Sequence, residues 1–229
     1  MENSKKIRVI GVGGVARAGK DTFVSILIDL LEKNGLKAKR IALADPLKSY
    51  CDTFCKEAIG FSSFTQVSEE KNLIRPFLVW FGDAKRKQTN GKFWTDLAEK
   101  NIQNAEIDGY DYAIISDVRY DHYPEDELVW LKNKMNGTLV HVSRYDEFKG
   151  KVPKSSQLKV QKRFVPPAND HEMINDPKIK KKADYVVEWP TMDIPIPELI
   201  NDKNMKSYVE KFLQTQKLHQ YSSSSNSES

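Results

Sequence analysis

The sequence predicts an α/β fold built on a parallel sheet, because strand-like apolar segments alternate with helical segments along most of the chain. Parallel strands joined through helices have right-handed crossovers, so their carboxyl ends should meet at one edge of the sheet, where ligands bind. The chain has 229 residues, of which 39% are hydrophobic and 30% charged, which suits a single domain over residues 1–220. The serine-rich residues 221–229 are expected to be disordered.

The first predicted strand covers residues 7–12, and a helix follows a glycine-rich loop and ends near Gly35. Residues 39–44 form the second predicted strand. A second helix should open with Asp45 as its N-cap and Pro46 at its first position. Its expected buried positions are Leu47, Tyr50, Cys51, Phe54 and Ala58.

A third helix should open at residues 68–70, and Pro76 is expected to kink or restart it. Residues 93–105 are also helical in pattern, and residues 112–116 form a buried strand that ends in Asp117. A further helix should open at residues 124–127 with acidic residues in its first turn. The apolar positions of the third helix are Leu73, Phe77, Trp80 and Phe81.

Residues 138–143 and 184–188 complete a set of five strands, and a C-terminal helix follows them. Between these last two strands, residues 149–169 are rich in lysine and proline and show no clear period. This segment is either a solvated loop or a mobile lid over phosphates.

A glycine-rich loop follows the first predicted strand. Residues 14–20 read Gly-Val-Ala-Arg-Ala-Gly-Lys, the G-x-x-x-x-G-K pattern, and Asp21 and Thr22 come next. Such a loop points successive backbone N–H groups at phosphate oxygens, and the helix after it adds the positive end of its dipole. Lys20 supplies a charge for the outermost phosphates. Asp21 stands where a magnesium-holding Ser or Thr is usual, and its carboxylate is able to serve Mg²⁺ directly or through water.

Two other interpretations of this loop stay open. The match is a coincidence in a glycine-rich turn, or Gly11, Gly13 and Ala16 form the G-x-G-x-x-A pattern of a dinucleotide-binding loop. The dinucleotide interpretation leaves Gly19 and Lys20 unexplained, and it lacks an acidic residue at a strand end about twenty positions on. A phosphate-binding loop is therefore favoured.

Charged residues follow the ends of two later strands. Asp117 and Arg119 follow the third strand, and Arg144 follows the fourth. Asp117 is expected to be a second anchor for Mg²⁺, and Arg119 to hold a transferring phosphoryl group with its planar fork. The competing interpretations are an ordinary strand-end cap for Asp117 and a surface arginine for Arg119.

Composition narrows the partners and the compartment. The net charge of +4 suits an anionic small ligand but is too low for a dedicated DNA-binding protein, and the basic residues 178–182 are explained by a solvated helix face. No apolar stretch approaches the ~18 residues of a membrane span, and residues 1–6 lack a signal-peptide pattern. We expect a cytoplasmic protein (host cytoplasm if viral) that binds small nucleotides, with no membrane partner and no stable nucleic-acid partner. Homodimer formation is left open.

Cys51 and Cys55 lie four residues apart on one helical face. They are either small core residues or half of a zinc site. The core interpretation is favoured because the chain has no second cysteine pair, and it fits a reducing compartment.

Several segments of the chain, in the order in which they occur, resemble the bacteriophage-type deoxynucleoside monophosphate kinases, a branch of the P-loop nucleoside monophosphate kinases. The resemblance is carried by residues 14–22, 44–48, 75–83, 93–94 and 109–122, and more weakly by residues 169–172 and 183–187. It implies a three-layer P-loop kinase fold with a five-stranded parallel sheet in the order 2-3-1-4-5. It also implies a substrate-binding segment at about residues 45–105 and a lid at about residues 149–169.

The resemblance implies transfer of the γ-phosphoryl group of ATP, with Mg²⁺, to a deoxynucleoside monophosphate, which supplies diphosphates for dNTP synthesis. The implied catalytic residues are Lys20, Arg119, Arg144 and Arg163. The implied ATP-binding residues are Gly14, Arg17, Ala18, Gly19, Lys20, Asp21 and Thr22. The implied acceptor-binding residues are Asp45, Lys48, Arg75, Trp94, Asp117, Arg119 and Asp121. The implied magnesium ligands are Asp21 and Asp117.

Two other functions stay open. One is a kinase of the same fold for another small phosphate acceptor, such as phosphomevalonate or dephospho-coenzyme A. The other is a nucleotide-binding ATPase associated with nucleic acid. Formation of ADP only when a nucleoside monophosphate is added would distinguish a monophosphate kinase from the ATPase.

Overall fold

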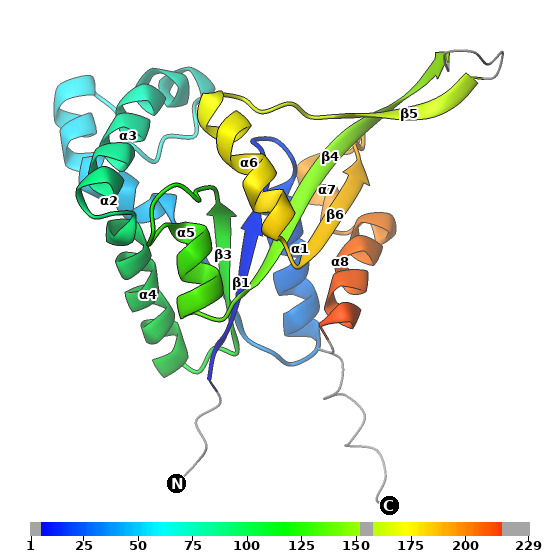
Figure 1. Ribbon diagram of the computed structural model, residues 1–229, viewed down its shortest axis with the longest axis horizontal. Coiled ribbons are helices and arrows are strands. Elements are labelled where there is room, and N and C mark those ends of the chain that lie inside the picture. The colour runs from blue at the N-terminus through cyan, green and yellow to red at the C-terminus, as the bar shows by residue number, and fades with distance from the viewer. Residues whose placement is uncertain (1–5, 152–157, 217–229) are drawn as a thin grey trace, which may run out of the picture.

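Five parallel strands form the centre of the fold in the order β2-β3-β1-β4-β6. The computed structural model describes residues 6–151 and 158–216, and Figure 1 shows helices on both faces of the sheet. The strands are β1 (Arg8–Gly13), β2 (Ala38–Ala42), β3 (Tyr112–Val118), β4 (Thr138–Lys151) and β6 (Tyr185–Pro190). The three-layer α/β fold class is therefore confirmed, and so is the expected strand order, with β6 as the fifth parallel strand.

The sheet buries two apolar layers because neighbouring residues of each strand point to opposite faces. On one face, Ile10 and Val12 of β1 belong to the core that includes α1 and α8. On the other face, Val9 belongs to the core formed with α4, α5 and α6. The helices of the two layers are α1 (Lys20–Lys33), α8 (Lys203–Thr215), α4 (Lys92–Ile107), α5 (Glu127–Val129) with the π-helical turn Trp130–Lys134, and α6 (Asp170–Lys182).

The helices α2 (Ala44–Phe54) and α3 (Ser68–Gln88) stand beside the sheet, and a π-helical turn, Cys55–Ile59, extends α2. The expected start of α2 was wrong by two residues, since Leu43 and not Asp45 occupies the cap position, and no side chain caps the helix. Pro76 does not restart α3, which runs through it as one helix. The carbonyl that a proline leaves without a partner belongs to Asn72, on an exposed part of this helix.

Several aromatic and apolar residues expected in the core of this helical segment are exposed. Tyr50 and Phe54 of α2 are 57% and 53% exposed, and Leu73 and Trp80 of α3 are 67% and 65% exposed. Ala58 is exposed as well. The helices cover only part of each other, so these side chains lie at the surface, where Tyr50 packs at a tilt against Phe93 and Phe54 against Phe77. Cys51 and Cys55 are buried free thiols, which confirms their interpretation as core residues.

Residues 149–169 are more regular than their composition indicates. β4 continues past the sheet and pairs antiparallel with β5 (Leu158–Phe164). The two strands form a ribbon that projects from the body in Figure 1. Tyr145 at its base stacks edge-on against Phe164, with ring centroids 5.7 Å apart. The expectation of an irregular segment was therefore wrong for β5. Residues 152–157 and the serine-rich tail at 221–229 lie outside the described residues.

The remaining helix, α7 (Ile196–Leu199), links β6 to α8. Within the described ranges, none of the helices combines the length and the apolar character that crossing a membrane requires.

Candidate functional site

The loop between β1 and α1 has the backbone of a phosphate-binding loop. Arg17 and Gly19 adopt positive φ angles of 64° and 93°, and Gly14 has a φ of 134°. A Cβ atom at Gly14 would lie 2.2 Å from the carbonyl oxygen of Val142 on β4, so only glycine fits against this strand. At Gly19 a Cβ atom would lie 2.7 Å from the ring of Trp189. The loop is therefore packed tightly against Val142 of β4 and Trp189 of β6.

Lys20 turns back over the loop that precedes it. Its Nζ atom donates to the carbonyl oxygens of Gly14 and Val15 at 2.7 and 2.8 Å, and it lies 3.3 Å from Oδ1 of Asp117. The side chain is nearly buried. The structure thus brings together Lys20 and Asp117, which stand 97 positions apart in the sequence.

Arg119 pairs with the same aspartate. Its Nη2 atom donates to Oδ2 of Asp117 at 2.5 Å. Burial alone would raise the pKa of Asp117, but the charges of Arg119 and Lys20 outweigh it and hold the pKa below its usual value. Burial acts to lower the pKa of Arg119, yet the Asp117 carboxylate raises it overall. Asp117 and Arg119 therefore stay charged at neutral pH.

A cavity of about 330 Å³ lies against one side of the loop. We call it the Trp189 cavity, and it is lined by Arg17, Lys20, Thr22, Arg144, Trp189 and Pro190. The indole Nε1 of Trp189 donates to the carbonyl oxygen of Ala18 at 2.9 Å, which fixes this wall to the loop. The buried Nε atom of Arg144 has no hydrogen-bond partner among the residues that the structure describes. A guanidinium with a spare donor beside a phosphate-binding loop suits an anionic ligand.

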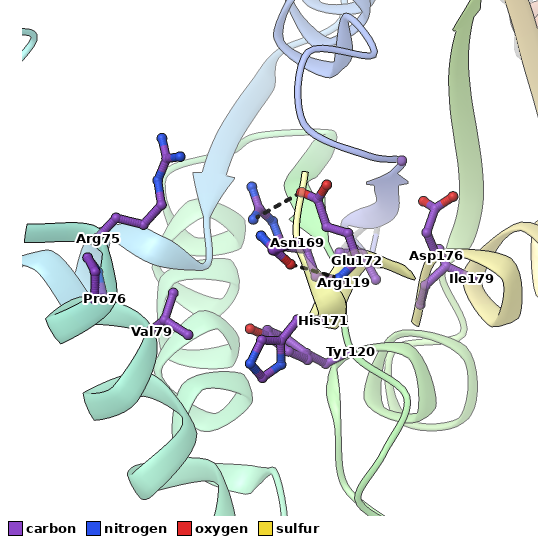
Figure 2. Close-up of a pocket in the computed structure, with 12 residues that line it drawn as sticks. Arg75, Pro76, Val79, Arg119, Tyr120, Asn169, His171, Glu172, Asp176 and Ile179 are labelled. Atoms are coloured by element: carbon purple, nitrogen blue, oxygen red, sulfur yellow. Dashed lines mark hydrogen bonds and ion pairs between the residues drawn. The ribbon is translucent and has the colours of Figure 1, made fainter. Parts of the chain in front are cut away.

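Two further cavities lie on the other side of the loop. The Arg75 cavity, of about 230 Å³, is lined by residues that include Gly14, Arg75, Val79, Arg119, Tyr120 and Glu172. Figure 2 shows Arg75 and Val79 of α3 on one side of it and Arg119, Tyr120 and Glu172 on the other. The Trp94 cavity, of about 180 Å³, shares Arg75, Val79, Arg119 and Tyr120 and adds Leu47, Lys48, Trp94 and Asp117.

The cations of these two cavities differ in their partners. Arg119 is paired with Asp117, whereas no carboxylate of the described residues pairs with Arg75. Lys48 lies with its ammonium 5.6 Å from the ring centre of Phe64 and likewise has no described carboxylate partner. Trp94 is buried and donates from Nε1 to the carbonyl oxygen of Gly82 at 3.1 Å, so it forms a fixed wall.

Some of the expected site residues are not brought to this centre. Asp21 lines the Trp189 cavity, but its carboxylate is 82% exposed and bonds Arg40 at 2.7 Å. Asp121 pairs with Lys182 of α6 at 2.8 Å, and Asp45 is exposed at the start of α2. Arg163 lies on the ribbon, with its guanidinium 4.9 Å from the ring centre of Phe148. The roles assigned to these four side chains stay predictions.

Two buried acids behind Arg119 had been interpreted as ordinary first-turn residues of a helix. Asp126 accepts from Nε and Nη2 of Arg86 at 2.7–3.0 Å and is fully buried. Glu127 accepts from the backbone N–H of Arg119 at 2.6 Å, and burial raises the pKa of its carboxyl to about 7. Tyr120 stacks on Arg86, with the guanidinium carbon 3.3 Å from the ring centre, and burial raises the pKa of its hydroxyl to about 12. These groups fix the segment that carries Arg119.

Sequence reasoning also missed Glu172, at the start of α6. Its Oε1 atom accepts from the backbone N–H of Ala16 in the loop and lies 3.7 Å from Nη1 of Arg119, as Figure 2 shows in part. The available signal was the spacing from Asn169, because an asparagine followed three positions later by a glutamate is a common helix start.

The residues at the loop fit a magnesium ion. Oδ1 of Asp117 is a buried carboxylate oxygen that accepts no hydrogen bond in the described part of the chain, although Nζ of Lys20 lies 3.3 Å away. Carboxylate oxygen is the ligand type that Mg²⁺ prefers. Within residues 6–151 and 158–216, no group of three or more His, Cys, Asp or Glu side chains forms a protein-only metal site. Mg²⁺ in phosphate sites takes most of its ligands from phosphates and water, so one or two carboxylates suffice.

Comparisons with known proteins add little to this geometry. No protein-family model matches the sequence, and no curated protein matches it. Among solved structures, shikimate kinase from Acinetobacter baumannii in complex with shikimate is 11% identical, with 95% of this chain and 97% of that chain covered and a TM-score of 0.40. Shikimate kinase from Aquifex aeolicus is 16% identical, with 92% and 99% covered and a TM-score of 0.38. Similarity this low leaves the function to be argued from the site itself.

Proposed function

We propose that the protein transfers the γ-phosphoryl group of ATP to a deoxynucleoside monophosphate and so supplies diphosphates for dNTP synthesis. ATP is assigned to the Trp189 cavity, and the acceptor to the Arg75 and Trp94 cavities. The observation that carries the proposal is the pair of guanidinium groups, Arg75 and Arg119, that line the acceptor side of the loop.

An acceptor with a phosphate group explains this pair better than an uncharged alcohol does. Arg119 has a carboxylate partner, but Arg75 is exposed and has none among the described residues, so its guanidinium is available to bind a second anion. Asp117 pairs with both Arg119 and Lys20, so a monophosphate bound between Arg75 and Arg119 would also lie close to Lys20.

An apolar, planar group on the acceptor is supported by the walls of the Trp94 cavity. Leu47, Val79 and Trp94 supply apolar surface, while Tyr120 and Glu127 supply polar groups. Small-ligand sites typically combine such walls with a few polar groups that fix orientation. A nucleobase fits this description, and the short chain of phosphomevalonate leaves these walls uncovered.

The charged side chains at the loop and at the strand ends have separate tasks in the transfer. Lys20 and Arg144 bind the phosphates of ATP, and the backbone N–H groups of the loop hold them in line with the acceptor. Arg119 contacts the transferring group, whose developing charge its fork stabilises. When bound beside Asp117, Mg²⁺ neutralises charge on the phosphate oxygens of ATP. The apolar walls on the acceptor side exclude water, which would otherwise accept the phosphoryl group.

The test is an acceptor screen. The protein is incubated with ATP, Mg²⁺ and each nucleoside or deoxynucleoside monophosphate in turn, and ADP and the new diphosphate are measured together. We expect ADP to form in equal amount to the diphosphate, and only with an accepted monophosphate. ADP formed without an acceptor and stimulated by DNA would instead indicate the nucleic-acid-associated ATPase.

A matched pair of variants ties the activity to the loop. Lys20→Ala should lower kcat by on the order of a hundredfold, because a preorganised charge of this kind contributes about 3 kcal/mol in the transition state. Lys33→Ala removes an exposed lysine from the other end of the same helix and should leave kcat unchanged. Activity of Lys20→Ala within about threefold of wild type would contradict the assignment.

A further inference from the structure

The Glu172 side chain joins three parts of the fold that are distant in sequence. It lies in the first turn of α6 and is 7% exposed. Its Oε2 atom accepts from the backbone N–H of Ala168 at 2.8 Å, and its own N–H donates to Oδ1 of Asn169 at 2.9 Å. These two bonds form a local cap of the helix.

The other carboxylate oxygen serves no bond within α6. Oε1 accepts from the backbone N–H of Ala16 at 3.0 Å and lies 3.7 Å from Nη1 of Arg119. A cap needs only Oε2. Burying the second oxygen costs free energy unless donors replace its water, and here the donors come from the phosphate-binding loop and from Arg119.

These contacts close a ring that begins and ends in the loop. From Arg119, Nη2 bonds Oδ2 of Asp117, whose Oδ1 lies 3.3 Å from Nζ of Lys20. Lys20 in turn donates to the carbonyl oxygen of Gly14 at 2.7 Å. Glu172 completes the ring by joining Arg119 to Ala16. The ring contains two cations and two carboxylates, so its formal charge is zero.

We infer that Glu172 is a positioning residue for the transfer: it holds the Arg119 guanidinium against the phosphate-binding loop before the acceptor arrives. With carboxylates on both sides, the plane of the guanidinium is fixed, and the entropy of ordering it is not lost during the reaction. The inference rests on the proposed function for the identity of the reaction, but the ring itself is a property of the free protein.

Glu172→Gln tests the ring because glutamine keeps the size of the side chain but has one acceptor oxygen and no charge. The matched control is Asp170→Asn, the same chemical change at an exposed position of the same helical turn. The first readout is amide hydrogen exchange at Ala16 and Ala168 in the free protein. Glu172→Gln should speed exchange at Ala16 about three- to tenfold, the equivalent of one hydrogen bond, and Asp170→Asn should not. Unchanged exchange at Ala16 would overturn the inference.

The second readout is a double-mutant cycle with Arg119→Ala. Glu172→Gln alone should lower kcat about tenfold or more while the KM for ATP changes less than about twofold, because a displaced catalytic group affects the transition state most. In the Arg119→Ala protein, the same substitution should change kcat no further. If the two effects multiply, Glu172 does not act through Arg119 and the inference is wrong.

The two readouts separate failure of this inference from failure of the proposed function. If no monophosphate is phosphorylated by the wild-type protein, the proposed function is wrong, and the exchange experiment alone still decides whether Glu172 holds the loop.

Discussion

Arg119 is the side chain on which most contacts of the site converge. Asp117 holds its Nη2 atom, Glu172 lies beside its Nη1 atom, and Glu127 accepts its backbone N–H. The guanidinium therefore has a fixed direction in the free protein. A lysine at this position would keep the charge, but its single nitrogen is unable to reach two anions in one plane.

We predict that Arg119→Lys is not a conservative change. It should lower kcat by on the order of a hundredfold or more, as loss of an arginine contact to a transferring phosphoryl group does. The KM for ATP should stay within about twofold of wild type. Steady-state kinetics at varied ATP and saturating acceptor measure both constants. A large rise in the KM for ATP with kcat preserved would show that Arg119 binds the ground state only.

Glu127 makes stability depend on pH. Burial raises the pKa of its carboxyl from 4.5 to about 7, so the folded state binds this proton more tightly than the unfolded state does. The stability that this proton contributes is complete below about pH 4.5 and is lost as the pH rises through 7. Relative to Glu127→Gln, the wild-type free energy of unfolding should fall by about 3 kcal/mol between pH 4.5 and pH 8.

Urea unfolding of the two proteins at several pH values measures this difference. The Glu127→Gln variant is the reference for the wild-type protein, because glutamine does not titrate and the two proteins share every other titratable group. Parallel stability curves would mean that Glu127 titrates normally.

At the scale of elements, a buried ion pair helps to fix α3 to the body of the protein. Arg86, near its C-terminal end, is 4% exposed and bonds Asp126, which is fully buried and also accepts the backbone N–H groups of His122 and Tyr123. The same helix carries Arg75 and Val79 into the acceptor cavities. The position of the acceptor walls therefore depends on this pair.

Asp126→Ala should destabilise the protein by about 3–5 kcal/mol, because it leaves the Arg86 charge buried without its main partner. Asp83→Ala removes the second, more exposed carboxylate that contacts Arg86 and should cost less than about 1 kcal/mol. Denaturant unfolding of the two variants against wild type checks both values. Equal losses would mean that the Asp126 pair does not fix the helix.

The contrast between elements also shows what the sequence alone could predict. The five parallel strands and the helices α1, α3, α4 and α8 were found because each has a periodic apolar face. The exposure of Trp80 and Phe54 was not found, since a periodic pattern identifies an apolar face but not whether another element covers it. Asp126 was misinterpreted for a related reason: its partner Arg86 lies 40 residues away, so nothing local distinguishes a buried acid from a first-turn one.

Some residues of the candidate site could likewise be found from the sequence, and others could not. The loop and the residues at the strand ends were placed correctly at one edge, because the order of strands and helices fixes where carboxyl ends meet. Glu172 and Glu127 were missed because their roles depend on backbone N–H groups of other segments. The ribbon was missed because β5 has no apolar alternation to detect: Val160 and Phe164 share one face with Lys162.

At the scale of the whole molecule, the ribbon of β4 and β5 occupies most of the segment expected to be a lid, residues 149–169, and it projects from the body. Its base lies beside Arg144, which lines the Trp189 cavity, while Arg163 lies further out on β5. A catalytic role for Arg163 therefore requires the ribbon to fold down over bound nucleotides.

Limited trypsin digestion tests this movement at Lys162 and Arg163, which are exposed on the ribbon. If the ribbon closes, ATP and an accepted monophosphate together should slow cleavage after these residues more than either ligand alone does, because a closed segment is sequestered from the protease. Mass spectrometry of the first fragments measures the rate. An unchanged rate would remove Arg163 from the catalytic residues and leave Arg119 and Arg144.

The Trp189 cavity and the two cavities beyond the loop share no lining residue. Both substrates therefore have room on the protein at the same time, and no side chain has to carry the phosphoryl group from one to the other. A single direct displacement inverts the configuration of a γ-phosphorus made chiral with oxygen isotopes, whereas a phosphorylated enzyme would retain it. Plots of reciprocal rate against reciprocal ATP concentration, measured at several acceptor concentrations, should therefore intersect. Parallel lines would indicate a ping-pong mechanism with a phosphorylated enzyme as the covalent intermediate.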